Sequence, residues 1–205
     1  MPNTGYVISY DEYGIGFTAL SIGTEEQWVG VRFTGLNEGF VTEIDFGLVN
    51  EQFWNTDELN WEVHLYDSFD GVYPGNLKDA VSGSSYVGGW HTIQVDSMEI
   101  LPGQDFFIGI RFPNSGYVMA FDNIGESSGR SYYSSDGGSF SDGLSSYGDC
   151  NIRAKVSTET YVEIDDKFSL PTEITLHSNF PNPFNPGTML SFSIGKTSKV
   201  KLDIY

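Results

Sequence analysis

Short segments that alternate between apolar and polar residues recur along most of the chain. Residues 28–33, 60–67 and 105–112 each place every second side chain on one apolar face. Clusters of Gly, Asn, Asp and Pro separate such segments, as at 71–76 and 136–138. A period of two is typical of a strand with one buried face, and the clusters favour turns. About nine such segments predict an all-β chain folded as a β-sandwich of the jelly-roll type.

The composition fits a packed and strongly acidic domain. The 205 residues are 39% hydrophobic and 15% aromatic, which is enough to build a core. The formal net charge is −18, because 28 acidic residues face 10 basic ones. This charge repels nucleic acids and anionic membrane surfaces, so we expect neither as a partner. No apolar run approaches the length of about 18 residues that a spanning helix needs, so we expect no membrane span.

Motifs for catalysis or zinc binding are missing from the sequence. The three histidines form no His-Glu-x-x-His motif, no Gly-x-Ser-x-Gly elbow occurs, and Cys150 is the single cysteine. Cys150 shares a strand face with apolar residues, so we expect it to be a buried small hydrophobe. The prediction is therefore a protein that is not an enzyme. An alternative stays open: exposed carboxylates such as Glu43, Asp45 and Glu62 form the pair of a glycoside hydrolase, which only their spacing in the fold decides.

Turn carboxylates and loop aromatics are the candidate binding groups. Ca²⁺ takes several oxygen ligands, and the best local cluster contains Asp67 and Asp70, which are the candidate ligands of a structural Ca²⁺; the alternative is that these turn aspartates bind only the backbone. Sugars pack their CH faces on aromatic rings while polar neighbours bind their hydroxyl groups. The residues predicted to bind an extracellular glycan or protein in this way are Trp54, Tyr73, Trp90, Tyr132 and Tyr133.

A proline-rich segment near the C-terminus predicts a second structural unit. Residues 178–188 contain three prolines, three asparagines and two phenylalanines. Each proline fixes its own φ and favours an extended conformation in the residue before it, so the segment cannot be helical. Strand patterns flank it at 174–176 and 190–194. The predicted domains are a sandwich at 1–158, a linker at 159–169 and a small β-domain at 170–205.

Residues 170–205 resemble the start of the C-terminal sorting domain of proteins exported by the type IX secretion system. The matching parts are the Leu-Pro pair at 170–171, the Asn/Pro/Phe segment, Thr188 and the Val-Lys-Leu-Asp-Ile-Tyr strand at 200–205. The resemblance implies an Ig-like β-domain, recognition by the type IX machinery, and a secreted or cell-surface location. The family's domain continues past its Ile-Tyr strand, so we expect the recognition signal to lie beyond residue 205. The motif residues are Asn179, Pro181, Asn182, Pro183, Phe184, Asn185 and Pro186.

Residues 15–157 resemble the lectin-like jelly-roll modules appended to secreted bacterial peptidases and other exported proteins. The matching motifs include Trp-Val-Gly-Val-Arg-Phe at 28–33, Leu-Pro-Gly-Gln-Asp-Phe-Phe at 101–107 and Cys-Asn-Ile-Arg-Ala-Lys-Val at 150–156. The resemblance implies a non-catalytic accessory or adhesion-like module of a secreted protein. The alternatives are a carboxylate-dependent glycoside hydrolase, an appendage of a secreted peptidase, and a structural spacer or filament subunit.

Overall fold

The computed structural model divides the chain into two compact units, Met1–Tyr161 and Val162–Tyr205. The residues that it describes are 5–12, 18–20, 26–54, 56–113, 118–144, 146–158, 175–176 and 192–193. Strands β1 to β12 lie in the first unit, and β13 and β14 lie in the second. The domain limits expected from the sequence, at residues 158 and 169, stay predictions.

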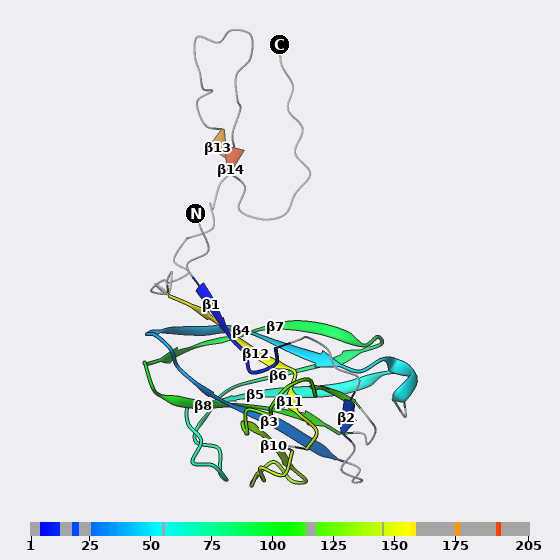
Figure 1. The fold of residues 1–205 in the computed structure, drawn as a ribbon. Helices are drawn as coiled ribbons and strands as arrows, with labels where there is room; N and C mark the ends of the chain where they lie inside the picture. Colours follow the sequence, from blue (N-terminus) through cyan, green and yellow to red (C-terminus); the bar gives the residue numbers. More distant parts are fainter. Residues whose placement is uncertain are drawn as a thin grey trace. The chain divides into compact units, whose positions relative to one another are not determined.

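The first unit is a sandwich of two antiparallel sheets, which appear as two layers in Figure 1. The seven-stranded sheet contains β1 (Gly5–Ile8), β2 (Thr18–Leu20), β4 (Gly39–Leu48), β7 (Gly89–Ile100), β9 (Met119–Asp122), β11 (Asp149–Cys150) and β12 (Ile152–Ser157). The five-stranded sheet contains, in spatial order, β10 (Ser131–Ser134), β3 (Gln27–Thr34), β8 (Asp105–Phe112), β5 (Leu59–Tyr66) and β6 (Leu77–Ser85). The described part of the chain has no α-helix, only the 3-10 turn η1 (Glu51–Phe53). The predicted all-β sandwich is therefore confirmed.

The alternation in the sequence explains how the two sheets form one core. Val63 on β5 lies opposite Ile110 on β8, which in turn lies opposite Val29 on β3. This apolar row is buried, as is Ile44 in the other sheet, where it pairs with Ala154 on β12. The inner faces of the two sheets therefore pack against each other. Cys150 is also buried here, which confirms the small hydrophobe expected from the sequence.

A bulge in β4 corrects one expectation about the core. Strict alternation places Phe40 on the same inner face as Ile44. In the structure Glu43 and Val41 pair with the consecutive β12 residues Lys155 and Val156, so β4 carries one extra residue there, and Val41 is fully buried while Phe40 is partly exposed. An extra residue in one strand inverts the inward and outward sides, and a simple period-two pattern does not reveal it.

A second apolar cluster covers the outer face of the five-stranded sheet. The loop at 67–76, between β5 and β6, and the loop at 135–144, after β10, fold over this face. They are joined where the Phe140 N–H donates to the Val72 carbonyl at 2.8 Å. We call this cluster the aromatic roof; its buried members are Trp28, Phe69, Phe107, Tyr132 and Phe140.

Ring contacts hold the aromatic roof together. Phe69 stacks on Phe107 with ring centroids 4.3 Å apart and planes 13° apart, and Phe140 meets Phe107 edge-on at 4.8 Å. Gly30 on β3 lies beside the Phe107 ring, and a β-carbon at Gly30 would collide with it. The missing side chain thus lets a large ring lie close to the sheet.

In the second unit, two short strands lie within the patterns predicted on either side of the proline-rich segment. β13 (Thr175–Leu176) pairs antiparallel with β14 (Phe192–Ser193), and Leu176 lies opposite Phe192. They form their own two-stranded sheet. The linker at 159–169 and the motif residues between 179 and 186 lie outside the described residues, so the sorting-domain interpretation stays a prediction.

Candidate functional site

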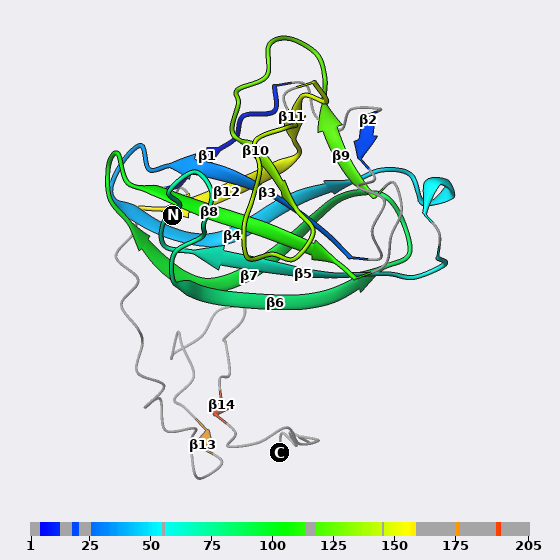
Figure 2. The same cartoon turned by 90° about the horizontal axis from the view of Figure 1, so that it is seen from below.

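The hairpin of β6 and β7 joins the two sheets at one edge of the sandwich, as Figure 2 shows. β6 is the last strand of the five-stranded sheet, and β7 lies beyond β4 in the seven-stranded sheet. Along β7 from 89 to 96 the residues alternate between half-buried and exposed, and from Met98 onward they alternate between buried and exposed. The inward side chains Val81, Ile93 and Val95 are only half-buried, although they pack on the core. The two sheets therefore part along this edge and leave it accessible.

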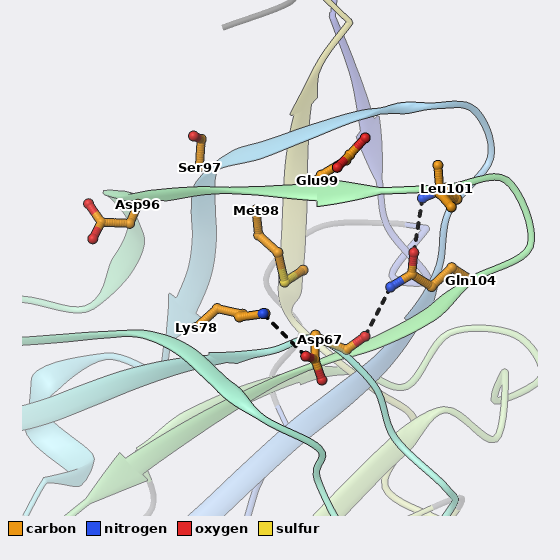
Figure 3. Close-up of a pocket in the computed structure, with 8 residues that line it drawn as sticks. All are labelled: Asp67, Lys78, Asp96, Ser97, Met98, Glu99, Leu101 and Gln104. Carbon is orange, nitrogen blue, oxygen red and sulfur yellow. Dashed lines mark hydrogen bonds and ion pairs between the residues drawn. The ribbon is translucent and has the colours of Figure 1, made fainter. Parts of the chain in front are cut away.

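A pocket of about 450 Å³ opens where these two edge strands separate (Figure 3). We call it the edge pocket; it is lined by Asp67, Lys78, Asp96, Ser97, Met98, Glu99, Leu101 and Gln104. In Figure 3 the Met98 side chain points between the strands toward Lys78 and Asp67. The volume of the edge pocket lies within the range of small-molecule sites, about 300–1,000 Å³.

One wall of the edge pocket is fixed by polar contacts. The Lys78 Nζ lies 3.3 Å from Asp67 Oδ2, and the Gln104 side-chain amide donates to the Asp67 carbonyl at 3.1 Å. The Gln104 Oε1 accepts the Leu101 N–H at 3.1 Å, which ties the β7–β8 turn to this wall. Partial burial raises the pKa of Asp67, but hydrogen bonds from Asn76 and other donors outweigh it and leave the pKa below its usual value. This carboxylate therefore stays ionised.

The part of β7 that borders the edge pocket carries two carboxylates, Asp96 and Glu99. The side chains of Asp96 and Glu99 have no hydrogen-bond or ion-pair partner among the described residues, and both are exposed. The Asp96 N–H donates to Asp79 Oδ2 at 2.7 Å, which anchors this part of β7 to β6. Figure 3 shows Glu99 on the side of β7 opposite to Met98, so this carboxylate lies at the rim of the pocket, where it suits a ligand that offers hydroxyl groups or positive charge.

The outer face of the seven-stranded sheet carries an ordered polar network next to β7. The Lys155 Nζ lies 3.0 Å from Glu43 and 2.9 Å from Asp45. Thr92 donates to Asp45 at 2.6 Å, and Gln94 donates to Glu43 at 2.8 Å. The hydrogen bonds from Gln94 and Lys155 lower the pKa of Glu43. A glycosidase needs one carboxylic acid with a raised pKa, so this pairing gives no support to Glu43 as the acid.

At the start of β7, Trp90 presents an aromatic ring that is held in place. The Trp90 residue is 37% exposed, and the Arg153 guanidinium lies 4.1 Å from its ring centroid. Arg153 Nε donates to both carboxylate oxygens of Asp11, at 3.1 and 3.0 Å. Burial raises the pKa of Asp11, and the Arg153 contacts oppose that rise. An ion pair and a cation–π contact together fix the exposed ring.

The five aromatic residues predicted to bind a ligand lie in different surroundings. Trp54, 8% exposed, belongs to the main core, and Tyr132, 5% exposed, belongs to the aromatic roof. Tyr133 packs half-buried against the main core. Tyr73 and Trp90 are exposed, on the loop at 67–76 and on β7. Burial leaves little of Trp54 and Tyr132 for a ligand, so the prediction continues to rest on the two exposed rings.

The carboxylates predicted to bind Ca²⁺ both stabilise the loop at 67–76. Asp70 accepts the N–H groups of Tyr73 and Val72 at 2.7 and 2.8 Å, and these bonds lower its pKa. Asp67 accepts the Asn76 N–H at 2.9 Å. The described residues hold no group of three or more His, Cys, Asp or Glu placed to bind a metal ion. Calcium stays a prediction from the sequence.

His64 takes part in a polar cluster on the outer face of the five-stranded sheet. Its ring nitrogens lie 3.4 Å from Glu62 and 3.3 Å from the Tyr66 hydroxyl. Arg111 donates to Glu62 at 2.8 Å. Glu62, the third carboxylate of the glycosidase alternative, is thus paired with a cation.

The other notable histidine contact is between His91 and Ser85, which lie across the β6–β7 turn. The Ser85 Oγ is 3.4 Å from the ring and accepts the Trp61 Nε1–H at 2.9 Å. Ser85 is buried, and the other ring nitrogen of His91 lies 3.1 Å from the Val87 carbonyl. Both partners are therefore used in structural contacts, Ser85 with Trp61 and His91 with the Val87 carbonyl.

Sequence reasoning missed Asp96 and Glu99, and it missed the way β7 links them to Trp90. The signal was present as a row of exposed positions at every second residue of β7. It was overlooked because the apolar alternation that predicts this strand ends at Val95, whereas the strand continues to Ile100, and a bulge between Gln94 and Met98 shifts the alternation before Glu99.

Among the described residues, no helix is long and apolar enough to cross a membrane.

Comparisons with known proteins agree on the first unit. The family model described as a lectin-like domain matches residues 9–158. The crystal structure of the cysteine protease and lectin-like domains of Cwp84, a surface layer associated protein of Clostridium difficile, matches 78% of this chain with 14% identity and a TM-score of 0.55. The clostridial cysteine protease Cwp84 after propeptide cleavage matches 76% with 16% identity and a TM-score of 0.56. The matches span 37% and 41% of those chains, and no curated protein matches this one.

Proposed function

This chain belongs to the lectin-like domain family, and from that premise we propose that it is a non-catalytic accessory module that binds a glycan. The observation that carries the proposal is the edge pocket, bordered by Asp96 and Glu99, which have no side-chain partner within the part of the chain that the structure describes. Carboxylates accept hydrogen bonds from sugar hydroxyls, and the Leu101 side chain, which also lines the pocket and is exposed, offers an apolar surface to the CH face of a ring. A protein ligand is the alternative outcome of the test.

The accessory role is supported by what surrounds the pocket. In the described residues, Glu43, Asp45 and Glu62 are paired with cations, and the Ser85–His91 pair is used for packing. The similar Cwp84 structure joins a lectin-like domain to a cysteine protease in a surface layer associated protein. By analogy, we propose that this module works outside the cell, attached to a larger protein.

Binding of the folded chain to an array of microbial glycans tests the proposal. We expect signal from the wild type and a loss of roughly tenfold in affinity when Asp96→Asn and Glu99→Gln are combined, because each change removes a strong acceptor. Glu38→Gln and Glu126→Gln together are the matched control, since both residues are exposed and lie outside the pocket. A blank array with folded protein, or equal loss in the control, contradicts the glycan proposal.

We also propose that residues 170–205 begin a type IX sorting domain. The support is the Asn/Pro/Phe motif between strand patterns, together with the pairing of β13 and β14. Deleting residues 170 onward from the parent protein should retain it inside a host that has the type IX machinery. Unchanged export of the deleted form contradicts this proposal and leaves the glycan proposal untouched.

A further inference from the structure

We propose that the edge pocket and Trp90 are the two ends of one binding track along β7, and that this track holds a linear, uncharged polysaccharide chain. The inference rests on the proposed glycan-binding function and specifies its ligand class. It assigns Trp90 to a subsite remote from the pocket.

The burial pattern of β7 defines the track. Trp90, Thr92, Gln94 and Asp96 are exposed at every second position, and Ser97 and Glu99 continue the exposed row after the bulge. A strand rises about 3.3 Å per residue, so the six steps from Trp90 to Asp96 cover roughly 20 Å. That length exceeds one sugar ring and matches an extended chain of several linked rings.

The Trp90 end of the track offers a platform that needs no rearrangement. Arg153 lies over the indole and is itself held by the buried carboxylate of Asp11. A ring fixed before binding loses little conformational freedom when a sugar stacks on it. Because the ring remains accessible on the sheet surface, the CH face of a pyranose can pack against it.

The middle of the track offers polar groups whose orientation is set. The Thr92 hydroxyl donates its proton to Asp45, so its oxygen lone pairs remain available to accept. The Gln94 side-chain NH₂ donates to Glu43, which turns its carbonyl oxygen toward other donors. Both groups therefore accept hydrogen bonds from sugar hydroxyls along the chain.

Charge selects against acidic polysaccharides. The two free carboxylates, Asp96 and Glu99, lie at the pocket end, and the nearby cation Lys155 is already shared by Glu43 and Asp45. Lys78 in the pocket wall is paired with Asp67, and Arg153 beside Trp90 is paired with Asp11, so uronic acid or sulfate groups would meet unpaired carboxylates and cations that are already neutralised. The track thus fits neutral chains, including N-acetylated ones.

Calorimetric titration of the full chain with cello-, chito- and manno-oligosaccharides, from dimer to hexamer, tests the track. For at least one series we expect the hexamer to bind about tenfold more tightly than the dimer, which corresponds to about 1.4 kcal/mol from stacking on Trp90. Trp90→Ala should abolish this gain. Tyr147→Ala is the matched control, because Tyr147 is 38% exposed and lies outside β7.

The outcomes separate this inference from the function on which it rests. Binding that is equally tight for dimer and hexamer, or hexamer binding that Trp90→Ala does not weaken, overturns the track and leaves a pocket-only glycan site. No binding of any oligosaccharide overturns both. Unchanged near-ultraviolet circular dichroism of the Trp90→Ala chain, apart from the lost indole, establishes that the loss is not one of folding.

Discussion

On the outer face of the five-stranded sheet, aromatic rings are buried beneath two loops, whereas on the outer face of the seven-stranded sheet the side chains near β7 are polar and reach solvent. Phe69, Phe107 and Phe140 meet each other in the aromatic roof. Across the sandwich, Thr92 and Gln94 make hydrogen bonds on the surface. The comparison teaches that burial, not aromatic content, separates a face that stabilises the fold from one that can bind.

The two faces also use their charged groups differently. In the loops of the roof, the carboxylates of Asp70 and Asp136 accept backbone N–H groups and thereby hold turns. Beside β7, ion pairs of Arg153 and Lys155 hold side chains in place, while Asp96 and Glu99 stay unpaired. If the comparison is correct, changes in the roof alter stability, and changes along β7 alter binding.

The largest effect is expected from Phe107→Ala. Phe107 is fully buried and contacts three other rings of the roof, so its loss should lower the free energy of unfolding by about 3–5 kcal/mol. Urea denaturation measures this. Phe53→Ala is the control, since Phe53 is 53% exposed and should change stability by less than about 0.5 kcal/mol. Similar losses of unfolding free energy in both variants would contradict the interpretation of the aromatic roof as a second core.

A smaller effect is expected from Arg153→Met, which removes the partner of the buried Asp11 carboxylate. We expect a loss of about 1–3 kcal/mol at neutral pH, reduced because Arg153 is partly exposed. Burial raises the folded-state pKa of Asp11, and without Arg153 the rise is larger. A carboxyl with a raised folded pKa binds its proton more tightly when folded, so the penalty should shrink as pH falls toward about 4.

Urea denaturation of wild type and Arg153→Met at neutral and acid pH checks that sign. Lys155→Met is the control, because the Lys155 partners Glu43 and Asp45 are more accessible than Asp11. A penalty for Arg153→Met that grows on acidification would show that Asp11 is not desolvated as described.

The smallest effect concerns the loops of the roof in acid. Hydrogen bonds from Tyr73 and Val72 lower the pKa of Asp70, and bonds from Gly138 and Ser134 lower that of Asp136. A carboxyl whose pKa is lower in the folded chain stabilises the folded state at pH values above about 3.9, the pKa of an aspartate in the unfolded chain. This stabilisation is lost as the pH falls through the folded-state pKa. Asp70→Asn combined with Asp136→Asn should therefore reduce the loss of unfolding free energy that the wild type shows when the pH is lowered below about 4. A profile identical to wild type would mean that these turns do not hold the roof.

Much of the fold was predictable because its central strands obey a simple rule. β3, β5 and β8 have one face in the core, and their alternation placed them within one residue or so of their observed limits. β6 was not predicted, because Leu77–Ser85 is rich in Ser, Gly and charged residues at the edge where burial is incomplete. The bulges at Val41 and in β7 were also missed, since register depends on the partner strands.

The candidate site was harder to predict than the fold. Trp90 was chosen because of its residue type and is exposed in the structure, but Trp54 and Tyr132 were chosen for the same reason and are buried. The edge pocket brings together residues from β7, β6 and two turns, and a local sequence pattern does not predict that these segments lie side by side. Contacts between residues distant in sequence decide which carboxylates are left unpaired.

Backbone amide chemical shifts of the isotopically labelled chain, titrated with the hexasaccharide that binds most tightly, test the central claim most directly. The account predicts shifts along Gly89–Ile100 and in the neighbouring part of β4, with the loops at 67–76 and 135–144 unaffected except at Asp67 and its neighbours in the pocket wall. Shifts centred on the aromatic roof, with β7 unchanged, would contradict it.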